Sequence, residues 1–228
     1  MKNALYTILL LLSYAAPLFV AGDAVGTPSG PWHPLLQSNS APDWRGWKEP
    51  GLPAGWRVVD GVLSKDGRAD DLVTLQSYRN FELELEWKIG KGGNSGIFYR
   101  GTREYDRIYW SAPEYQLCDD ANDNDGKNPL TATGSDYGLY GVPYGVVRPY
   151  DHWNKARIVV IGAHVEHWLN GKKVVEYEFG STDWTQKVAA SKFGAYRHYG
   201  LAGSGLIGIQ GDHLGALAVR NMRIRELQ

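Results

Sequence analysis

The sequence predicts an all-β protein in which two antiparallel sheets pack as a sandwich or jelly roll. Many short segments alternate apolar and polar residues, as strands with one buried face do. The connections between these segments are rich in Gly and Asn, and the chain holds 28 glycines, which suit tight turns. No long segment has a sustained helical period, apart from about a turn of helix near residues 185–190.

The clearest strand covers residues 81–87, where apolar residues alternate with Glu82, Glu84 and Glu86. Between two further strands, Asn170-Gly171 is the strongest hairpin signal in the chain, because both residues accept the positive φ that a tight hairpin turn requires. The other expected strands cover residues 56–63 (with a turn at 60–61), 71–76, 95–100, 114–118, 157–161, 165–169, 172–177, 206–210 and 216–227.

The N-terminus predicts export. Residues 1–22 have a single Lys, an apolar middle and a small-residue end, which is typical of a signal peptide cleaved between about Ala21 and Ala24. An uncleaved membrane anchor is the alternative, since about 20 apolar residues can span a bilayer. We expect a flexible Gly/Pro-rich leader over 23–31 and one domain over 32–228, secreted or periplasmic and without a membrane span after cleavage.

Composition excludes some classes of function and leaves others open. The 24 basic and 25 acidic residues nearly cancel, so no chain-wide field favours nucleic acid or anionic lipid, and we expect no nucleic-acid partner. Cys118 is the single cysteine, so no internal disulfide can form. The 9 Trp and 14 Tyr suit the flat apolar faces of sugar rings, but they suit core packing equally well.

Cofactor signals are weak. The chain has no dinucleotide-binding fingerprint, so we expect no nicotinamide cofactor, and no nucleophile elbow. His164 and His167 differ in strand parity and should point to opposite faces, so they should not share a metal. The acidic segment 119–126 does not fit the EF-hand template, which leaves a looser divalent-metal site or a solvated loop. It lies in a strand-poor stretch, 119–153, of the length that functional loops often have.

Polar side chains gather at the ends of three predicted strands. Asn94 lies in a Gly-rich turn that leads into a strand ending at Arg100. Glu114 and Gln116 share one face of the next strand, and Asp119 follows its last residue. A late strand ends in Gln210 and a polar turn with His213. Burying Glu and Gln without partners is costly, and an Arg that meets the Glu would keep it ionised. The alternative is a structural Arg–Glu pair beside a turn.

An ordered set of short motifs carries a family resemblance. The set is Gly93-Asn94-Ser95-Gly96-Ile97-Phe98, Glu114-Tyr115-Gln116, Gly138-Leu139-Tyr140, Trp153-Asn154, Leu169-Asn170-Gly171 and Arg220-Asn221-Met222-Arg223-Ile224. Arranged in this order over residues 32–227, the chain resembles the 3-keto-disaccharide hydrolase domain family, formerly a domain of unknown function. The residues 210–215 match the family's late Gln/Asp/His turn with slight differences in spacing. The resemblance implies a concanavalin-like jelly roll, export in bacteria and cleavage of glycosides that carry a ketone at C3.

The implied chemistry is an elimination. A C3 ketone acidifies the C2 proton, which Glu114 or His213 could remove as a general base, and Arg100 or a bound divalent metal could stabilise the enolate. Loss of the C1 substituent and addition of water then give net hydrolysis. Further candidates for binding the sugar are Asn94, Gln116, Gln210, Glu86, Asp119 and Tyr140. The alternative is a non-catalytic, lectin-like carbohydrate-binding module, because jelly rolls host both functions.

Overall fold

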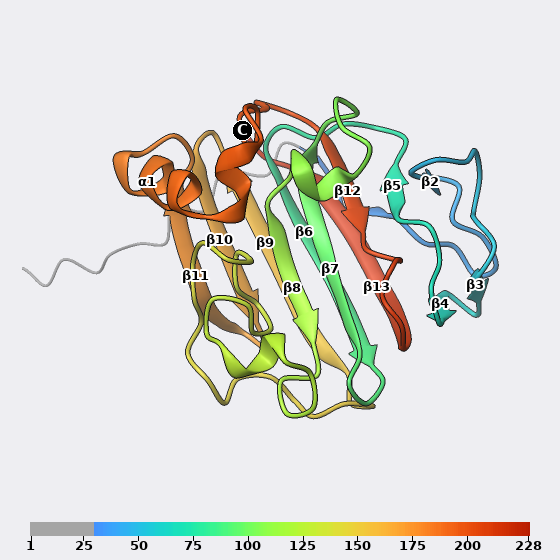
Figure 1. Cartoon of the computed structure of the whole chain (residues 1–228). Coiled ribbons are helices and arrows are strands. Elements are labelled where there is room, and N and C mark those ends of the chain that lie inside the picture. Colours follow the sequence, from blue (N-terminus) through green and yellow to red (C-terminus); the bar gives the residue numbers. More distant parts are fainter. Residues whose placement is uncertain (1–29) are drawn as a thin grey trace, which may run out of the picture.

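Two antiparallel sheets packed face to face form the protein, which we describe from a computed structural model over residues 30–228 (Figure 1). The eight-stranded sheet has the order β11-β10-β9-β6-β13-β4-β3, with β1 beside β13. Its strands are β1 (His33–Pro34), β3 (Trp56–Val59), β4 (Val62–Asp66), β6 (Phe81–Ile89), β9 (Asn154–Ile161), β10 (His164–Leu169), β11 (Lys172–Glu178) and β13 (Ala216–Glu226).

The second sheet has five strands in the order β2-β5-β12-β7-β8. They are β2 (Trp44–Gly46), β5 (Leu72–Thr74), β7 (Asn94–Gly101), β8 (Glu114–Cys118) and β12 (Leu206–Ile209). One α-helix, α1 (Thr182–Ala190), and three 3-10 turns, η1 (Ile108–Trp110), η2 (Asp125–Lys127) and η3 (Lys192–Ala195), complete the described elements. In Figure 1, α1 lies at one end of the sandwich, beyond β10 and β11.

The predicted all-β sandwich of two antiparallel sheets is confirmed, and its turns have the expected backbone. Asn170 and Gly171 have φ of 50° and 84°, as a two-residue hairpin between β10 and β11 requires. Strands β1 and β2 were not predicted, because two or three residues carry no readable alternation. The expected signal peptide and residues 23–29 of the leader lie outside the described residues, so both stay predictions.

The core lies between the sheets and follows the strand alternation. Leu83 and Leu85 of β6 and Tyr115 and Leu117 of β8 are almost fully buried in one cluster. A hydrogen-bonded chain of polar side chains crosses this core. The Tyr99 hydroxyl of β7 lies 2.8 Å from His167 Nε2 of β10 and 2.7 Å from the Tyr177 hydroxyl of β11.

The outer face of the eight-stranded sheet is covered by ion pairs instead of a further layer. Its central strand β6 alternates, so its glutamates point outward between basic residues of β9 and β13. Pairs form between Glu82 and both Arg157 and Arg225, between Glu84 and both Lys155 and Arg223, and between Glu86 and Arg220. Cross-strand pairing of this kind satisfies the charges of an uncovered sheet face.

The segment 119–153 holds no strand in the described structure, as its sequence predicts. It instead packs against the outer strand β8. The backbone of Asp136 bridges Tyr115 and Tyr140, and Tyr137 N donates to Glu114 O at 3.0 Å. Such bonds fix a long connection without regular structure beside the strand that it follows. None of the helices within residues 30–228 has the length and apolar character needed to cross a membrane.

Candidate active site

A polar cavity of about 310 Å³ lies over the outer face of the five-stranded sheet. Strand alternation places it there, because Glu114 and Gln116 alternate along β8 with Tyr115 and Leu117, which point into the core. The cavity is lined by Asn94, Tyr109, Glu114, Gln116, Asp125, Tyr137, Lys192, Phe193, Gln210, Asp212 and His213. It therefore brings together five of the residues that the sequence singled out: Asn94, Glu114, Gln116, Gln210 and His213.

Glu114 lies against the backbone of β7, where a glycine leaves room for it. A Cβ atom added to Gly96 would lie 2.0 Å from Glu114 Oε1 and 2.7 Å from its Cδ and Cγ atoms. The register explains this approach, because Gly96 pairs with Gln116 and is the diagonal neighbour of Glu114. A glycine at this point of β7 thus decides where the Glu114 carboxyl group lies in the cavity.

Burial raises the pKa of Glu114 from 4.5 to about 8. The Lys192 ammonium group lowers this pKa in part, while the carboxylates of Asp71, Asp125 and Asp136 raise it further. Glu114 is only 7% exposed, yet it opens on the cavity. A carboxyl group whose pKa lies near neutral pH can both accept and return a proton, as a general acid–base group must.

Hydrogen bonds connect the amide and carboxylate groups that line the cavity. With the Gln116 amide turned so that both of its ends have partners, its nitrogen lies 3.2 Å from Glu114 Oε1 and 3.0 Å from Ser95 O. Asn94 Nδ2 donates to Asp125 Oδ2 at 2.8 Å, and the Tyr137 hydroxyl donates to Asp125 Oδ1 at 3.2 Å. Both oxygens of Asp125 are therefore occupied by the protein. The carboxyl groups of the cavity that remain open to a ligand are Glu114 and Asp212, whose Oδ1 has no hydrogen-bond partner among the described residues.

Gln210 carries an unused acceptor into this cavity. Its Oε1 atom is buried and has no hydrogen-bond partner among the described residues. Its backbone is fixed, because Gln210 N donates to Gly96 O at 2.9 Å. A buried polar atom without a partner at the wall of a cavity is what a ligand hydroxyl would satisfy.

The loop 211–215, which carries His213, is held from beneath by two buried charged residues. The Lys65 ammonium group donates to His213 O at 2.8 Å and to Gly215 O at 3.2 Å, and Gly211 N donates to Asp71 Oδ1 at 2.8 Å. Burial lowers the pKa of Lys65 and raises that of Asp71 to about 6. His213 itself is exposed at the mouth of the cavity, so its position depends on these backbone contacts.

Lys192 supplies the positive charge of the site. It is the single Lys or Arg among the cavity-lining residues of the described structure, and it begins η3 just after α1. Its ammonium nitrogen lies 4.4 Å from the centroid of the Tyr137 ring and 5.1 Å from that of Phe193. An ammonium group above aromatic rings, close enough to lower the pKa of Glu114, is placed to stabilise negative charge on a ligand.

Arg100 does not reach the cavity, which corrects the prediction that it meets Glu114. Strand parity puts Arg100 on the face of Asn94, but β7 has a bulge: Leu206 pairs with Gly101 and Gly208 pairs with Phe98. Arg100 has a φ of 55°, and its side chain donates to Arg79 O and Gly162 O and lies over the Phe179 ring. It is thus a structural residue at one end of the sandwich.

Three further predicted binding residues lie outside the cavity. Glu86 pairs with Arg220 at 2.8 Å on the outer face of the eight-stranded sheet. Asp119 braces its own turn, where its Oδ2 accepts Gly92 N at 2.9 Å. The Tyr140 hydroxyl donates to Asp183 of α1 at 2.7 Å. These contacts use each polar group within the fold, so none of the three is in place to bind the sugar in the cavity.

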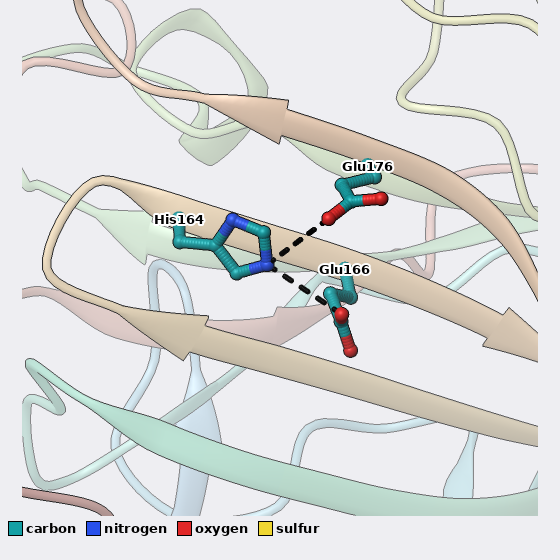
Figure 2. A group of neighbouring side chains, drawn as sticks. All are labelled: His164, Glu166 and Glu176. Carbon is teal, nitrogen blue, oxygen red and sulfur yellow. Dashed lines mark hydrogen bonds and ion pairs between the residues drawn. The ribbon is translucent and has the colours of Figure 1, made fainter. Parts of the chain in front are cut away.

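A possible metal-binding group lies elsewhere, on the outer face of the eight-stranded sheet. Within residues 30–228, His164, Glu166 and Glu176 are the group whose ligand atoms all lie within 4.8 Å of one another, and Figure 2 shows His164 Nε2 facing both carboxylates. Lys173 Nζ already lies 3.1 Å from Glu166 and 3.0 Å from Glu176. His167 points into the core instead, so the predicted opposite orientation of the two histidines is confirmed.

Sequence reasoning missed Lys192, Tyr137 and Tyr109. None of the three belongs to a strand pattern, since they lie in 3-10 turns or in the long segment 119–153. Asp125 and Asp212 do lie in segments that the sequence marks as polar. Asp125 belongs to the acidic segment 119–126, and Asp212 belongs to the late turn 210–215. The long segment is the feature that could have led to Tyr137, as functional residues concentrate in such loops.

The comparison with protein families agrees with this geometry. Residues 31–225 match the model of the 3-keto-alpha-glucoside-1,2-lyase-like domain, which covers nearly all of the described chain. The chain belongs to the 3-keto-alpha-glucoside-1,2-lyase-like family. The family prediction made from the ordered motifs is therefore confirmed.

Named relatives of this family member fall into near and distant groups. It is 35% identical over 216 residues to the 3-keto-disaccharide hydrolase of Bacteroides thetaiotaomicron, covering 81% of this chain and 74% of that protein. The crystal structure of a candidate glycosyl hydrolase from Parabacteroides distasonis has a TM-score of 0.80 and 32% identity, covering 86% and 94% of the two chains. An endo-1,3-beta-glucanase from Thermotoga petrophila, with 11% identity and a TM-score of 0.54 over 90% and 100% of the chains, shares the jelly-roll fold alone.

Proposed function

We propose that this protein is a glycoside-cleaving enzyme that acts on 3-keto-glycosides by elimination and hydration. The observation that carries the proposal is Glu114, a buried carboxyl group with a pKa of about 8 that opens on a sugar-sized cavity. The name and the 35% identity of the Bacteroides thetaiotaomicron relative support the substrate class.

The first step is removal of the C2 proton. The Glu114 carboxylate takes this proton, and the electrons of the C2–H bond move to form an enolate whose negative charge lies on the C3 oxygen. Lys192 replaces Arg100 as the cation that stabilises this oxygen, because it is the positively charged side chain of the cavity wall. Gln210 Oε1, which has no hydrogen-bond partner among the described residues, accepts a hydrogen bond from a hydroxyl group of the sugar and orients the ring.

The second step is loss of the group at C1. The enolate collapses to a C1–C2 double bond, the C1–O bond breaks, and His213 at the mouth of the cavity gives a proton to the leaving oxygen. Water then adds its oxygen at C1 and gives its proton to His213, while Glu114 returns the proton to C2, so the sum of the steps is hydrolysis. The elimination needs one carboxyl group, Glu114, whereas an ordinary glycosidase uses two.

The tryptophans on the outer face of the eight-stranded sheet give no support to the lectin-like alternative. A binding module of this kind would use exposed aromatic faces without a titratable cluster beneath them. The tryptophans of the eight-stranded sheet face are instead covered by cations: Arg223 and Arg225 lie over Trp32, and Arg220 lies over Trp153. The buried Glu114 beside Lys192 is costly to keep and favours catalysis.

The decisive experiment compares a 3-keto-glucoside with the unoxidised glucoside, each with and without a chelator. We expect cleavage of the keto compound alone, and the chelator arm reports whether a divalent metal takes part. Glu114→Gln, which is nearly isosteric, should lower kcat by roughly 10²–10⁴, as loss of a general base does. Equal cleavage of both compounds, or a folded and fully active Glu114→Gln variant, would contradict the mechanism.

We also propose that the protein is exported. The support is the sequence of residues 1–22, whose Lys2, apolar middle and small-residue end are typical of a signal peptide. Export would bring the enzyme to glycosides outside the cytoplasm. A mature N-terminus near residues 21–24 in the bacterial periplasm or medium is the expected result.

A further inference from the structure

We infer that an aromatic wall beside the cavity, formed by Tyr109, Trp110, Tyr196 and Tyr105, is the binding site for a ring-shaped leaving group. The inference rests on the proposed function and concerns the C1 substituent that this reaction expels. The reacting sugar fits the polar cavity, and a second ring, either a sugar or an aryl aglycone, would lie on the wall.

The wall is continuous with the cavity. Tyr109 of η1 lines the cavity, and its ring meets Trp110 at 5.8 Å with an interplanar angle of 89°. Trp110 is stacked on Tyr196 at 5.2 Å and 13°, and Tyr105 meets Tyr196 edge-on at 5.6 Å. Tyr196 directly follows η3, whose Lys192 and Phe193 also line the cavity. In Figure 1 the green segment near residue 110 and the orange segment after α1 lie at the same end of the sandwich.

These rings are partly exposed yet held in place. All four are half-buried, whereas Ile108 beneath them is fully buried. Ser111 Oγ donates to Ile108 O at 3.0 Å and accepts Thr102 N at 3.0 Å, which closes the loop that carries Tyr105, Tyr109 and Trp110. Gly200 N donates to Ser111 O at 2.9 Å and joins this loop to the segment of Tyr196. Aromatic faces fixed before binding lose little entropy when a ligand stacks on them.

The size and polarity of the cavity indicate which part of the substrate uses the wall. A volume of about 310 Å³ is at the small end of ligand cavities, which suits one sugar ring but not two. The polar groups that the mechanism needs all line the cavity, so the reacting ring belongs there. The C1 substituent must then leave through the mouth, and the flat apolar faces at the rim match a ring better than a chain or a small alkyl group.

The test measures selectivity. Three substrates are compared: a 3-keto-disaccharide, an aryl 3-keto-glucoside and methyl 3-keto-glucoside. In Trp110→Ala the ratio of kcat/KM for a ring-bearing substrate to that for the methyl compound should fall about tenfold, the value of a lost aromatic stack. Tyr196→Ala is the second variant and should act in the same direction. Trp153→Ala is the matched control, because Trp153 is also half-buried but lies on the opposite sheet.

Each outcome decides the inference. A fall with the disaccharide alone assigns the wall to a sugar, and a fall with the aryl compound alone assigns it to an aryl aglycone. Unchanged ratios in both folded variants, with an active wild type, overturn the inference and leave the proposed function standing. A wild type that cleaves none of the three compounds overturns the proposed function itself. Circular dichroism of each variant shows that the compared proteins are folded.

Discussion

Replacing Gly96 with Ala should inactivate the enzyme without unfolding it. The added Cβ would lie 2.0 Å from Glu114 Oε1, so this oxygen must move by roughly 1.4 Å to regain an ordinary contact. A displacement of about 1 Å of a reacting group can lower the rate about 10²-fold. Because Glu114 opens on the cavity, its side chain can move there without disturbing the core. We therefore expect kcat/KM for a 3-keto-glucoside to fall about 10²-fold.

The matched control is Gly203→Ala, since a Cβ at Gly203 would have no atom within 4 Å. Turnover and thermal melting of both variants are measured on the same preparations. Gly96→Ala should lower Tm by no more than about 4 °C, the equivalent of about 1 kcal/mol in a domain of this size. Full activity in a folded Gly96→Ala protein, or a large loss of Tm with unchanged activity per folded molecule, would refute the reasoning.

Four other predictions are open to direct measurement. The kcat/KM of the wild type should rise with pH and level off above the pKa of Glu114, about 8, because a general base must be ionised. Between about pH 4.5 and 8 the folded protein keeps the Glu114 proton while the unfolded chain has released it. The free energy of unfolding should therefore fall as the pH rises from about 4.5 to about 8, and it should fall less steeply in Glu114→Gln. Lys192→Met should lower kcat by about 10²-fold. It should also shift the rise of kcat/KM to higher pH, since the ammonium group lowers the pKa of Glu114, and an unchanged pH profile would contradict this. Lys65→Met should lower the free energy of unfolding by about 2–3 kcal/mol in urea titrations, because it leaves backbone carbonyls without their donor. N-terminal sequencing of the exported protein should begin within residues 21–24, and a mature protein that starts at residue 1 would exclude cleavage.

Most of the fold could be predicted from the sequence, because strand alternation and turn residues are local signals. Glu82, Glu84 and Glu86 marked β6 correctly as a strand with one outward polar face. Asn170-Gly171 marked the hairpin of β10 and β11, because both residues accept the positive φ that the turn requires. Strands β1 and β2 were missed, since they exist only through their partners in the sheet.

The candidate site was predictable only in part. Parity along β8 placed Glu114 and Gln116 on one face, and both line the cavity. The same reasoning failed for Arg100, because a bulge in β7 changes the direction of its side chain and a bulge has no clear signature in a single sequence. Lys192 could not be predicted either, since only the tertiary fold brings the end of α1 over β8.

The polar chain of Tyr99, His167 and Tyr177 has a consequence for the cavity. A core of Leu and Ile side chains would tolerate several lateral alignments of the two sheets, whereas hydrogen bonds of 2.7 and 2.8 Å tolerate only one. Glu114 is carried by the five-stranded sheet, while Lys192 follows β11 of the other sheet through α1. The hydrogen bonds among these three buried rings thus fix the alignment of the two sheets, and the separation of Glu114 and Lys192 in the cavity depends on that alignment.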